Sequence, residues 1–360
     1  MKIAHLVFSF LKWYIELIKR PSLMALGKFM ISWSLAALGV TNLNLSVKTD
    51  FINFSLNPST LSDGFLIFTL GVGVVFAAYA SWREYKVAED SQLLKIHHMG
   101  LVNHNIGDVQ SELPKPLKKI KPQPLNIDYA GSHKTENVNS LEEQLRKICQ
   151  IPEVIKDSGS SLNNGKKHLV YAGVAPVPMV AAAGHILGNM QNIHVADWDR
   201  RNKKWHFNDE FDDGEQLVFV DLRTSKKNLK SVSIIISLSL PISYESVYRD
   251  FPDSNSYGVK LESGKYGYDQ ICSNRKQERF ALDILCFINN EIIPNYPELQ
   301  CINFFVAAQS SFVFRLGASL NQGHLPKLLF HHFNPELSER KHPWSVLLRS
   351  GSISDYEVVA

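Results

Sequence analysis

The chain lacks the short motifs that mark the common enzyme classes. Its 360 residues contain no H-E-x-x-H zinc motif, no Walker loop, no G-x-S-x-G nucleophile elbow and no glycine fingerprint of a dinucleotide site. Each motif places the groups that its chemistry requires, so their absence leaves metalloprotease, ATPase, hydrolase and dehydrogenase activities without support. We therefore expect a protein that is not an enzyme and that uses no cofactor and no metal.

Cysteine and net charge are also scarce. The chain has four scattered cysteines, Cys149, Cys272, Cys286 and Cys301, and no C-x-x-C pair, which argues against a disulfide framework and a zinc site. The formal net charge of +3 is too small for a general nucleic-acid binder. Duplex nucleic acid is therefore not an expected partner.

Two apolar stretches without charge, 29–47 and 64–82, lie near the N-terminus. Each holds 19 residues, and at about 1.5 Å of rise per residue either can just cross a hydrocarbon core of roughly 30 Å. The first stretch could instead be a secretory signal, but no small-residue cleavage site follows it and a second full-length stretch does. The pattern predicts a helical hairpin with two membrane spans.

Charges around the two stretches orient the hairpin. Basic residues cluster before the first stretch and after the second, whereas the connection 48–63 holds one lysine. The positive-inside bias therefore places both termini and the C-terminal domain in the cytoplasm. Residues 1–28 are either an interfacial helix or an ordinary extension before the first span. In the second stretch Gly73, Ala77 and Ser81 form a small-residue stripe of the kind that lets copies of a helix pack, although such residues are common in membrane helices.

The hairpin and a polar juxtamembrane segment occupy 29–98, and 99–150 is predicted to be a linker. Prolines alternate with lysines between positions 114 and 124, which disfavours regular helix and favours an extended spacer. The spacer either touches anionic lipid headgroups or is a solvated linker. Residues 151–360 remain for a globular domain with a substantial core.

The globular region contains an internal duplication. An ungapped shift of 133 residues places 171–184 over 304–317 and superposes Gly184 on Gly317. Each copy shows an apolar strand, a short break, a helix that carries the glycine, a second apolar strand, and a hydrophilic turn before a strand led by tryptophan. The order predicts two related α/β lobes, with chance similarity of two common strand-helix units as the competing explanation.

The ends of the predicted strands are the candidate site. Continuous Val, Ile and Leu runs indicate central parallel strands that are covered on both faces, and ligands of such sheets bind beyond the carboxyl ends of the strands. The residues at these ends include Pro176 and Pro178 in the first copy, Ser239 in the connecting region, and Gln309 and Ser310 in the second copy.

Residues 233–241, 302–320, 328–333 and 344–348 resemble the SAVED domain. This domain is a fused pair of CARF-like, Rossmann-like lobes that senses cyclic oligonucleotides in bacterial antiphage signalling (CBASS). The resemblance covers 167–360, and the two preceding apolar stretches match the transmembrane effectors of the family. It implies two transmembrane helices in the bacterial inner membrane, a duplicated CARF-like cytoplasmic domain, and a cyclic tri- or dinucleotide as the ligand.

A cyclic oligonucleotide presents phosphates and base faces, so its receptor needs amide, hydroxyl or basic donors and planar stacking partners. Gln309, Ser310 and Ser311 stand where a helix begins after a strand, and there a serine either donates to a phosphate or only caps the helix. Arg315 follows one turn later on the same helical face and is the strongest basic candidate. Pro176 and Pro178 offer shape and apolar contact instead of hydrogen-bond donors.

Other side chains are weaker candidates for the same ligand. For the aromatic candidates, a place in the core is the more usual role. The aromatic candidates for stacking are Trp198, Trp205, Tyr266 and Tyr268, and the further basic candidates are Lys260 and Lys265.

These features predict a membrane-anchored receptor and effector. The SAVED-like domain binds a cyclic oligonucleotide, copies of the protein oligomerise, and the clustered spans disrupt the inner membrane, so lipid and further copies of the chain are expected partners. Two rivals remain open. One is a membrane-tethered ring nuclease that cleaves the cyclic nucleotide between its lobes, and the other is a signalling adaptor whose output is a partner protein.

Overall fold

The computed structural model divides the chain into two compact units, Met1–Asp90 and Ser91–Ala360. Residues 1–22, most of the expected interfacial segment 1–28, lie outside the described residues. The structure describes residues 23–39, 45–49, 52–56, 63–89, 91–100, 106–128, 138–157, 166–188, 190, 192–223, 230–267, 270–337, 340–349 and 357–359.

The first unit contains two helices, α2 (Leu23–Gly39) and α3 (Asp63–Glu89), and an antiparallel pair of strands, β1 (Leu45–Thr49) and β2 (Ile52–Leu56). Among the described residues, one helix, Gly64–Lys86, is long and apolar enough to cross a membrane. Helix α2 has 17 residues and rises about 25 Å, short of a hydrocarbon core of roughly 30 Å. The prediction of two full spans is therefore not confirmed.

The helix expected over 29–47 differs from α2 at both ends. Helix α2 begins at Leu23 and ends at Gly39, and residues 45–47 belong to β1. The early end has a local cause, because the glycine is followed by two β-branched residues and an asparagine, all weak helix formers.

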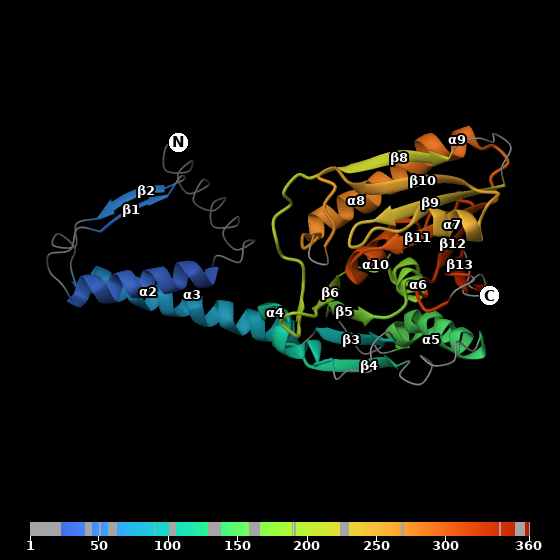
Figure 1. The fold of residues 1–360 in the computed structure, drawn as a ribbon. Coiled ribbons are helices and arrows are strands. Elements are labelled where there is room, and N and C mark those ends of the chain that lie inside the picture. The colour runs from blue at the N-terminus through green and yellow to red at the C-terminus, as the bar shows by residue number, and fades with distance from the viewer. Residues whose placement is uncertain are drawn as a thin grey trace. The chain divides into compact units, whose positions relative to one another are not determined.

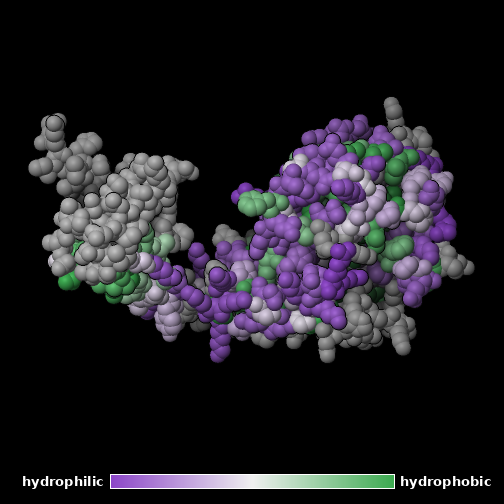
Figure 2. All heavy atoms as spheres, turned by 60° about the vertical axis from the view of Figure 1, so that its left-hand side comes forward, coloured by the Kyte–Doolittle hydropathy of each residue, from purple (hydrophilic) through white to green (hydrophobic). Residues whose placement is uncertain are grey.

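The exposed side of α3 is apolar. Phe65, Ile67, Phe68 and Val75 expose between 47% and 68% of their surface. In Figure 2 hydrophobic residues show on the described part of the first unit, whereas the visible face of the second unit is mainly hydrophilic. An exposed apolar helix face of this length suits a lipid environment.

The small-residue stripe of α3 packs against α2. A Cβ added at Gly73 would lie 3.0 Å from the Cβ of Met30, and one added at Gly27 would lie 2.8 Å from the amide nitrogen of Ala77. Small residues allow this close approach of two helices. The face of Gly73 and Ala77 was expected to contact other copies of the protein, but α2 occupies it, and only Ser81 of the stripe is exposed.

The second unit contains two sheets, seen in Figure 1 with two helices between them. The first sheet, in the order β4-β3-β5-β6-β7, is parallel except for β7. Its strands are β3 (Gln92–Met99), β4 (Pro122–Asp128), β5 (Lys167–Val174), β6 (Ile193–Asp199) and β7 (Lys204–His206).

The second sheet has the order β14-β13-β12-β11-β9-β10-β8. Its four central strands are parallel, and the outer strands at both sides are antiparallel. Its strands are β8 (Leu217–Arg223), β9 (Ser231–Ser237), β10 (Asn255–Leu261), β11 (Cys301–Ala307), β12 (Lys327–His331), β13 (Ser345–Leu348) and β14 (Glu357–Val359).

Helices of the second unit connect and cover the strands. A π-helical turn, Ile288–Ile292, directly follows helix α8, which ends at Phe287. The helices are η2 (Val109–Glu112), α4 (Lys115–Lys118), α5 (Val138–Asp157), α6 (Val177–Leu187), α7 (Tyr244–Asp250), α8 (Asn274–Phe287), α9 (Ile293–Asn295) and α10 (Ser310–Ser319).

The segment expected to be a linker, 99–150, belongs to the folded second unit, which begins at Ser91. It contains β4 and most of α5, and the strand before it, β3, was expected to be juxtamembrane. The prolines led to the wrong prediction of a spacer because β4 lies at the edge of its sheet, where it pairs with β3. At a sheet edge a proline that turns its missing N–H outward costs no ladder hydrogen bond.

The predicted duplication is confirmed and is longer than the sequence shows. Strand, helix, strand and strand follow in the order β5, α6, β6, β7 in the first lobe and β11, α10, β12, β13 in the second. Strands β3 and β4 stand beside β5 as β9 and β10 stand beside β11. Each lobe therefore has the order 4-3-5-6-7 or 10-9-11-12-13, and the first lobe starts at Gln92 instead of 151.

Helices α6 and α10 pack against each other between the sheets (Figure 1). A Cβ on Gly184 would overlap the carbonyl oxygen of Phe314, and a Cβ on Gly317 would overlap the carbonyl oxygen of Ala181. Under the shift of 133 residues, Ala181 corresponds to Phe314 and Gly184 to Gly317. The contact is thus reciprocal, as in an isologous twofold interface.

We predict that Gly317→Ala lowers the free energy of unfolding by about 1–3 kcal/mol, the usual cost of forcing a carbon into a packed contact. Gly323→Ala is the matched control, since nothing lies within 4 Å of a Cβ at that position. Urea titration of the two variants makes the comparison. Equal stability would mean that α6 and α10 do not approach this closely.

In the first unit, Gly73→Leu should separate α2 from α3, whereas Gly71→Leu should not, because a Cβ at Gly71 meets nothing within 4 Å. Thermal aggregation of the detergent-solubilised protein reports the difference. A loss of stability shared by both variants would contradict the packing of α2 on this face.

Candidate functional site

A cavity of about 180 Å³ lies where the two lobes meet at the carboxyl ends of their strands. The first lobe contributes the ends of β5 and β6 and the start of α6, and the second contributes Ser239 after β9 and the start of α10. This is the edge at which ligands of parallel sheets bind. The duplication brings two such edges to one cavity.

The cavity combines an apolar wall with polar and charged groups. Trp198 and Ser310 stand beside aliphatic side chains of both lobes. The aliphatic lining consists of Val174, Ala175, Val177, Val180, Ala308 and Val313, and the polar lining consists of Asp197, Asp199, Arg200, Arg201, His206, Ser239, Gln309 and Ser310.

Asp197 caps the helix that opens at this cavity. Its carboxylate accepts hydrogen bonds from the amide of Ser311 at 2.8 Å, from the Ser311 hydroxyl, and from the carboxamide of Asn208 at 2.9 Å. Asp197 is 4% exposed and Ser311 is fully buried. A negative charge at a helix N-terminus is favourable, so the first lobe supplies the anion that completes α10 of the second.

Ser310 and Ser311 therefore have different surroundings. Ser311 Oγ also accepts hydrogen bonds from Asn208 at 3.1 Å and from Gln277 at 2.7 Å, and it lies beneath the cavity. The Ser310 hydroxyl is buried at the cavity and has no hydrogen-bond partner among the residues that the structure describes. An unsatisfied buried hydroxyl is costly, so Ser310 is the serine available to a ligand.

Gln309 and Ser239 line the cavity as well, but the Gln309 carboxamide has partners. Its oxygen accepts from the amide of Ile271 at 3.0 Å, and its nitrogen lies 3.8 Å from the sulfur of Cys272. Ser239 is 7% exposed. Gln309 thus holds the segment before α8 against the start of α10.

Arg315 lies away from this cavity. Its guanidinium donates to Gln277 at 3.0 Å, to Asn274 at 2.7 Å, and to Glu278 at 2.8 Å. It lines a separate, wider groove of about 510 Å³ that includes Leu282 of α8. The sequence placed Arg315 and Ser310 in one site, and the structure does not bring them together.

The two prolines of the first copy frame α6. Pro176 is its N-terminal cap residue and Pro178 is buried in its first turn. Between them, Val177 lines the cavity, while neither proline does. The apolar contact expected from the prolines is supplied by their neighbour.

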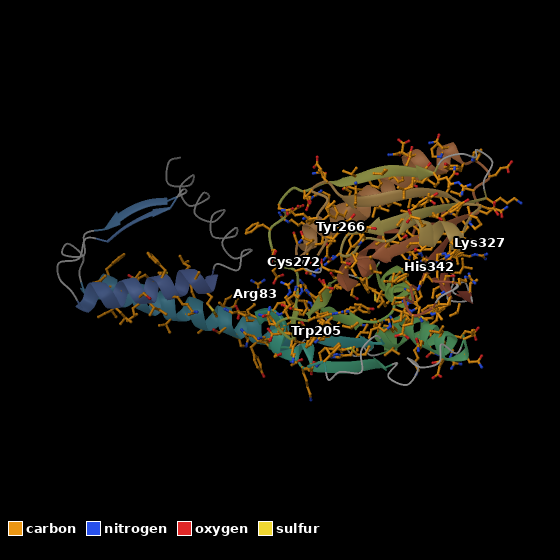
Figure 3. The ribbon with its side chains drawn as sticks, in the orientation of Figure 1. Arg83, Trp205, Tyr266, Cys272, Lys327 and His342 are labelled. Atoms are coloured by element: carbon orange, nitrogen blue, oxygen red, sulfur yellow. The ribbon has the colours of Figure 1, made fainter. Side chains whose placement is uncertain are left out.

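Of the aromatic candidates, Trp198 lies at the cavity. Its ring centre is 5.4 Å from that of Trp205, edge to face. Trp205, labelled in Figure 3, is 2% exposed and donates to the carbonyl of Gly107 at 2.6 Å, so it belongs to the core. Tyr266 is 43% exposed and does not line the cavity. Tyr268 lies outside the described residues, and the basic candidates Lys260 and Lys265 are exposed away from the lining.

Sequence reasoning predicted a hydrophilic turn between β6 and β7 but missed that this turn lies at the cavity. Asp199 accepts from the amides of Asn202 and Arg201, and these hydrogen bonds, with that from the Asn202 carboxamide, lower the pKa of its carboxyl. The bonds shape the turn that carries Arg200 and Arg201 to the cavity rim, where both are exposed. The signal was present, since this turn follows an apolar strand and contains four basic residues among 200–204.

No group of three or more His, Cys, Asp and Glu side chains in the described part of the chain could hold a metal ion. The lining instead includes a tryptophan side chain, two arginines, aliphatic side chains and Ser310, whose hydroxyl has no partner among the described residues. These groups suit an anionic ligand that also has a flat apolar part.

Two related α/β lobes with a shared cavity at their strand ends define the class of this domain. Residues 151–348 match the family model described as the SMODS-associated and fused to various effectors sensor domain, SAVED. The chain belongs to the SAVED family, a family of sensor domains.

Solved structures of two Cap4 receptors are similar to this chain. The Cap4 SAVED/CARF-domain containing receptor of Acinetobacter baumannii, with the cyclic trinucleotide 3'3'3'-cAAA or 2'3'3'-cAAA, is 12% identical with a TM-score of 0.49, over 80% of this chain and 59% of that chain. The Cap4 receptor of Moraxella osloensis is 11% identical with a TM-score of 0.43, over 78% and 60%. The chain thus spans less than two thirds of these receptors. No curated protein matches it.

The neighbouring serines give a direct test of the site geometry. We predict that Ser311→Ala lowers the free energy of unfolding by about 1–3 kcal/mol, because it leaves buried partners unsatisfied. Ser310→Ala should change it by less than about 0.5 kcal/mol or raise it, since the hydroxyl that it removes has no partner. Thermal or urea unfolding measures both. The opposite ranking would contradict the assignment of the two side chains.

Proposed function

We propose that the second unit binds a cyclic oligonucleotide in the cavity between its lobes. The observation that carries the proposal is the position of this cavity: it lies at the joined strand ends of both lobes of a SAVED-family domain. Its lining includes hydrogen-bond donors, a tryptophan and two arginines, groups that suit a nucleotide ligand.

The cavity takes one part of the ligand. At about 180 Å³ it is smaller than the roughly 300–1,000 Å³ of pockets that enclose a whole small molecule. A base of the ring enters beside Trp198 and reaches the hydroxyl of Ser310. The rest of a cyclic tri- or dinucleotide lies over the rim, where Arg200 and Arg201 meet its phosphates.

The proposed phosphate contact lies in the β6–β7 turn and not at the start of α10, where the sequence predicts it. The Ser311 amide in the first turn of α10 donates to the Asp197 carboxylate, which would repel a phosphate at that point. Arg315 already donates to three acceptors. The two arginines of the turn line the cavity and are exposed, and they are the proposed phosphate donors.

We further propose that the ligand is bound and not cleaved. Asp197, the most buried carboxylate of the lining, is held by Ser311 and Asn208 and is thereby unavailable as a general base. Cleavage of the ring would favour the ring-nuclease alternative. Incubation of the purified protein with ligand, followed by separation of intact and linear nucleotides, distinguishes the two.

The proposed output is at the inner membrane. Helix α3 has the length and composition for a span, and the basic residues that follow the apolar stretch favour a cytoplasmic second unit by the positive-inside bias. Ligand binding then assembles copies of the protein and the clustered helices disrupt the membrane. With the Gly73 face covered by α2, the proposed surface for contact with other copies is the exposed apolar side of α3. A signalling adaptor would bind the same ligand without loss of membrane potential.

Titration of the full-length protein in detergent with a panel of cyclic di- and trinucleotides tests the site. We predict that the double variant Arg200→Gln/Arg201→Gln weakens binding at least tenfold, since a hydrogen bond to a charged group contributes about 1.5–3 kcal/mol. Binding by the unchanged protein should weaken as salt rises because the phosphate contacts are partly ionic.

The matched control is Lys260→Gln/Lys265→Gln, which removes the same charge from exposed positions outside the lining. Trp198→Ala should weaken binding with a smaller change in salt dependence, since stacking contributes roughly 1–3 kcal/mol without charge. An equal loss of affinity in the control variant would mean that the effect comes from the overall charge and not from the two arginines. Failure of the folded, unchanged protein to bind any member of the panel would contradict the proposed function.

A further inference from the structure

Exposed lysines of the first lobe gather at the amino-terminal edge of its sheet. Lys121 directly precedes β4 and Lys166 directly precedes β5. The strands are parallel, with Leu93 opposite Pro122 and Gln92 opposite Lys167. The starts of β3, β4 and β5 therefore share one edge, and both lysines are exposed on it.

Three further lysines approach the same edge through α4. Lys115, Lys118 and Lys119 lie just before β4 and are exposed. The segment that carries them is packed, because Leu113, Leu117 and Ile120 are at most 5% exposed. Within 109–121, Glu112 is the single acidic residue. The fold thus displays a basic surface in a fixed place, where the sequence suggested a spacer.

This edge is also where the chain enters the second unit. Helix α3 ends at Glu89 and β3 begins at Gln92, so the strand follows the helix almost directly in the chain. The amino ends of the strands are thus close in the chain to the helix that suits a membrane. The last turns of α3 carry charges of both signs, with Arg83 and Lys86 beside Glu84 and Glu89, so the basic surface belongs to the second unit.

The ligand cavity lies at the opposite edge of the sheet. Strand β5 is eight residues long and extends from Lys167 to Val174, which lines the cavity. At about 3.3 Å per residue, roughly 25 Å separates the two ends. A partner bound at the amino-terminal edge of the sheet would therefore not cover the cavity.

We propose that the amino-terminal edge of the first lobe, with Lys115, Lys118, Lys119, Lys121 and Lys166, binds anionic lipid headgroups. The proposal rests on the membrane location proposed above. Clustered lysines next to a membrane helix are attracted by the negative surface potential of the cytoplasmic leaflet. The contact orients the domain, with the lysine edge on the lipid and the nucleotide cavity toward the cytoplasm.

Lysine acetylation of the full-length protein in lipid nanodiscs tests the contact. Discs of neutral phosphatidylcholine are compared with discs that contain 30% phosphatidylglycerol, and mass spectrometry gives the rate at each lysine. We expect anionic lipid to slow acetylation of Lys115, Lys118, Lys121 and Lys166 at least threefold. High salt should remove the protection. Lys260, Lys265 and Lys327, exposed on the second lobe (Lys327 in Figure 3), should react equally in both discs.

A matched pair of variants tests whether the slower acetylation reflects the orientation of the domain on the lipid. Lys115→Gln/Lys118→Gln/Lys121→Gln should lose the remaining protection at Lys166, whereas Lys260→Gln/Lys265→Gln/Lys327→Gln should keep it. Equal acetylation in both lipids, or equal slowing of the second-lobe lysines, would overturn the proposal. Nucleotide binding in the same discs separates this failure from failure of the proposed function. Extraction of the protein from membranes by alkaline carbonate would contradict the membrane location and with it the lipid contact, but not nucleotide binding.

Discussion

The second unit depends on the close approach of α6 and α10. Two helices from different lobes meet backbone to backbone because Gly184 and Gly317 carry no Cβ. This approach fixes the distance between the two sheets, and with it the distance between the strand ends that form the cavity. Packed interiors tolerate little change in such a contact. The glycines that reveal the duplication in the sequence are thus the residues that join the two copies in space.

A buried polar network completes the junction at the cavity. Asp197 of the first lobe meets Ser311 of the second, Ser311 meets Gln277 of α8, and Gln277 accepts from Arg315. The network extends from the lining of the cavity to the groove in which Arg315 lies. Hydrogen bonds that share partners in a low-dielectric interior polarise one another, so loss of one weakens its neighbours. A ligand that displaces Asp197 would thus disturb the groove on α8 as well.

The sequence was sufficient for the features that are local or repeated. The long apolar helix, the strand-helix-strand-strand repeat, and the placement of Ser239, Gln309 and Ser310 at strand ends follow from hydropathy and the 133-residue shift. It was insufficient for β4, whose prolines are tolerated only because it lies at an edge, a fact of sheet order. It was also insufficient for the partners of Ser311, because Asp197 lies 114 residues away in the chain. The local rule that serine opens a helix cannot tell a capped serine from a free one.

The central claim is that the ligand occupies the cavity between the lobes. Photo-crosslinking of the full-length protein with a cyclic trinucleotide that carries 8-azidoadenine tests it directly, because the modified residues can be mapped by mass spectrometry. The account predicts crosslinks within 197–206, which contains Trp198, and within 308–313. Unmodified ligand in excess should abolish them. Crosslinks concentrated instead within 278–282 and 314–319, which line the groove beside α8, would contradict the account.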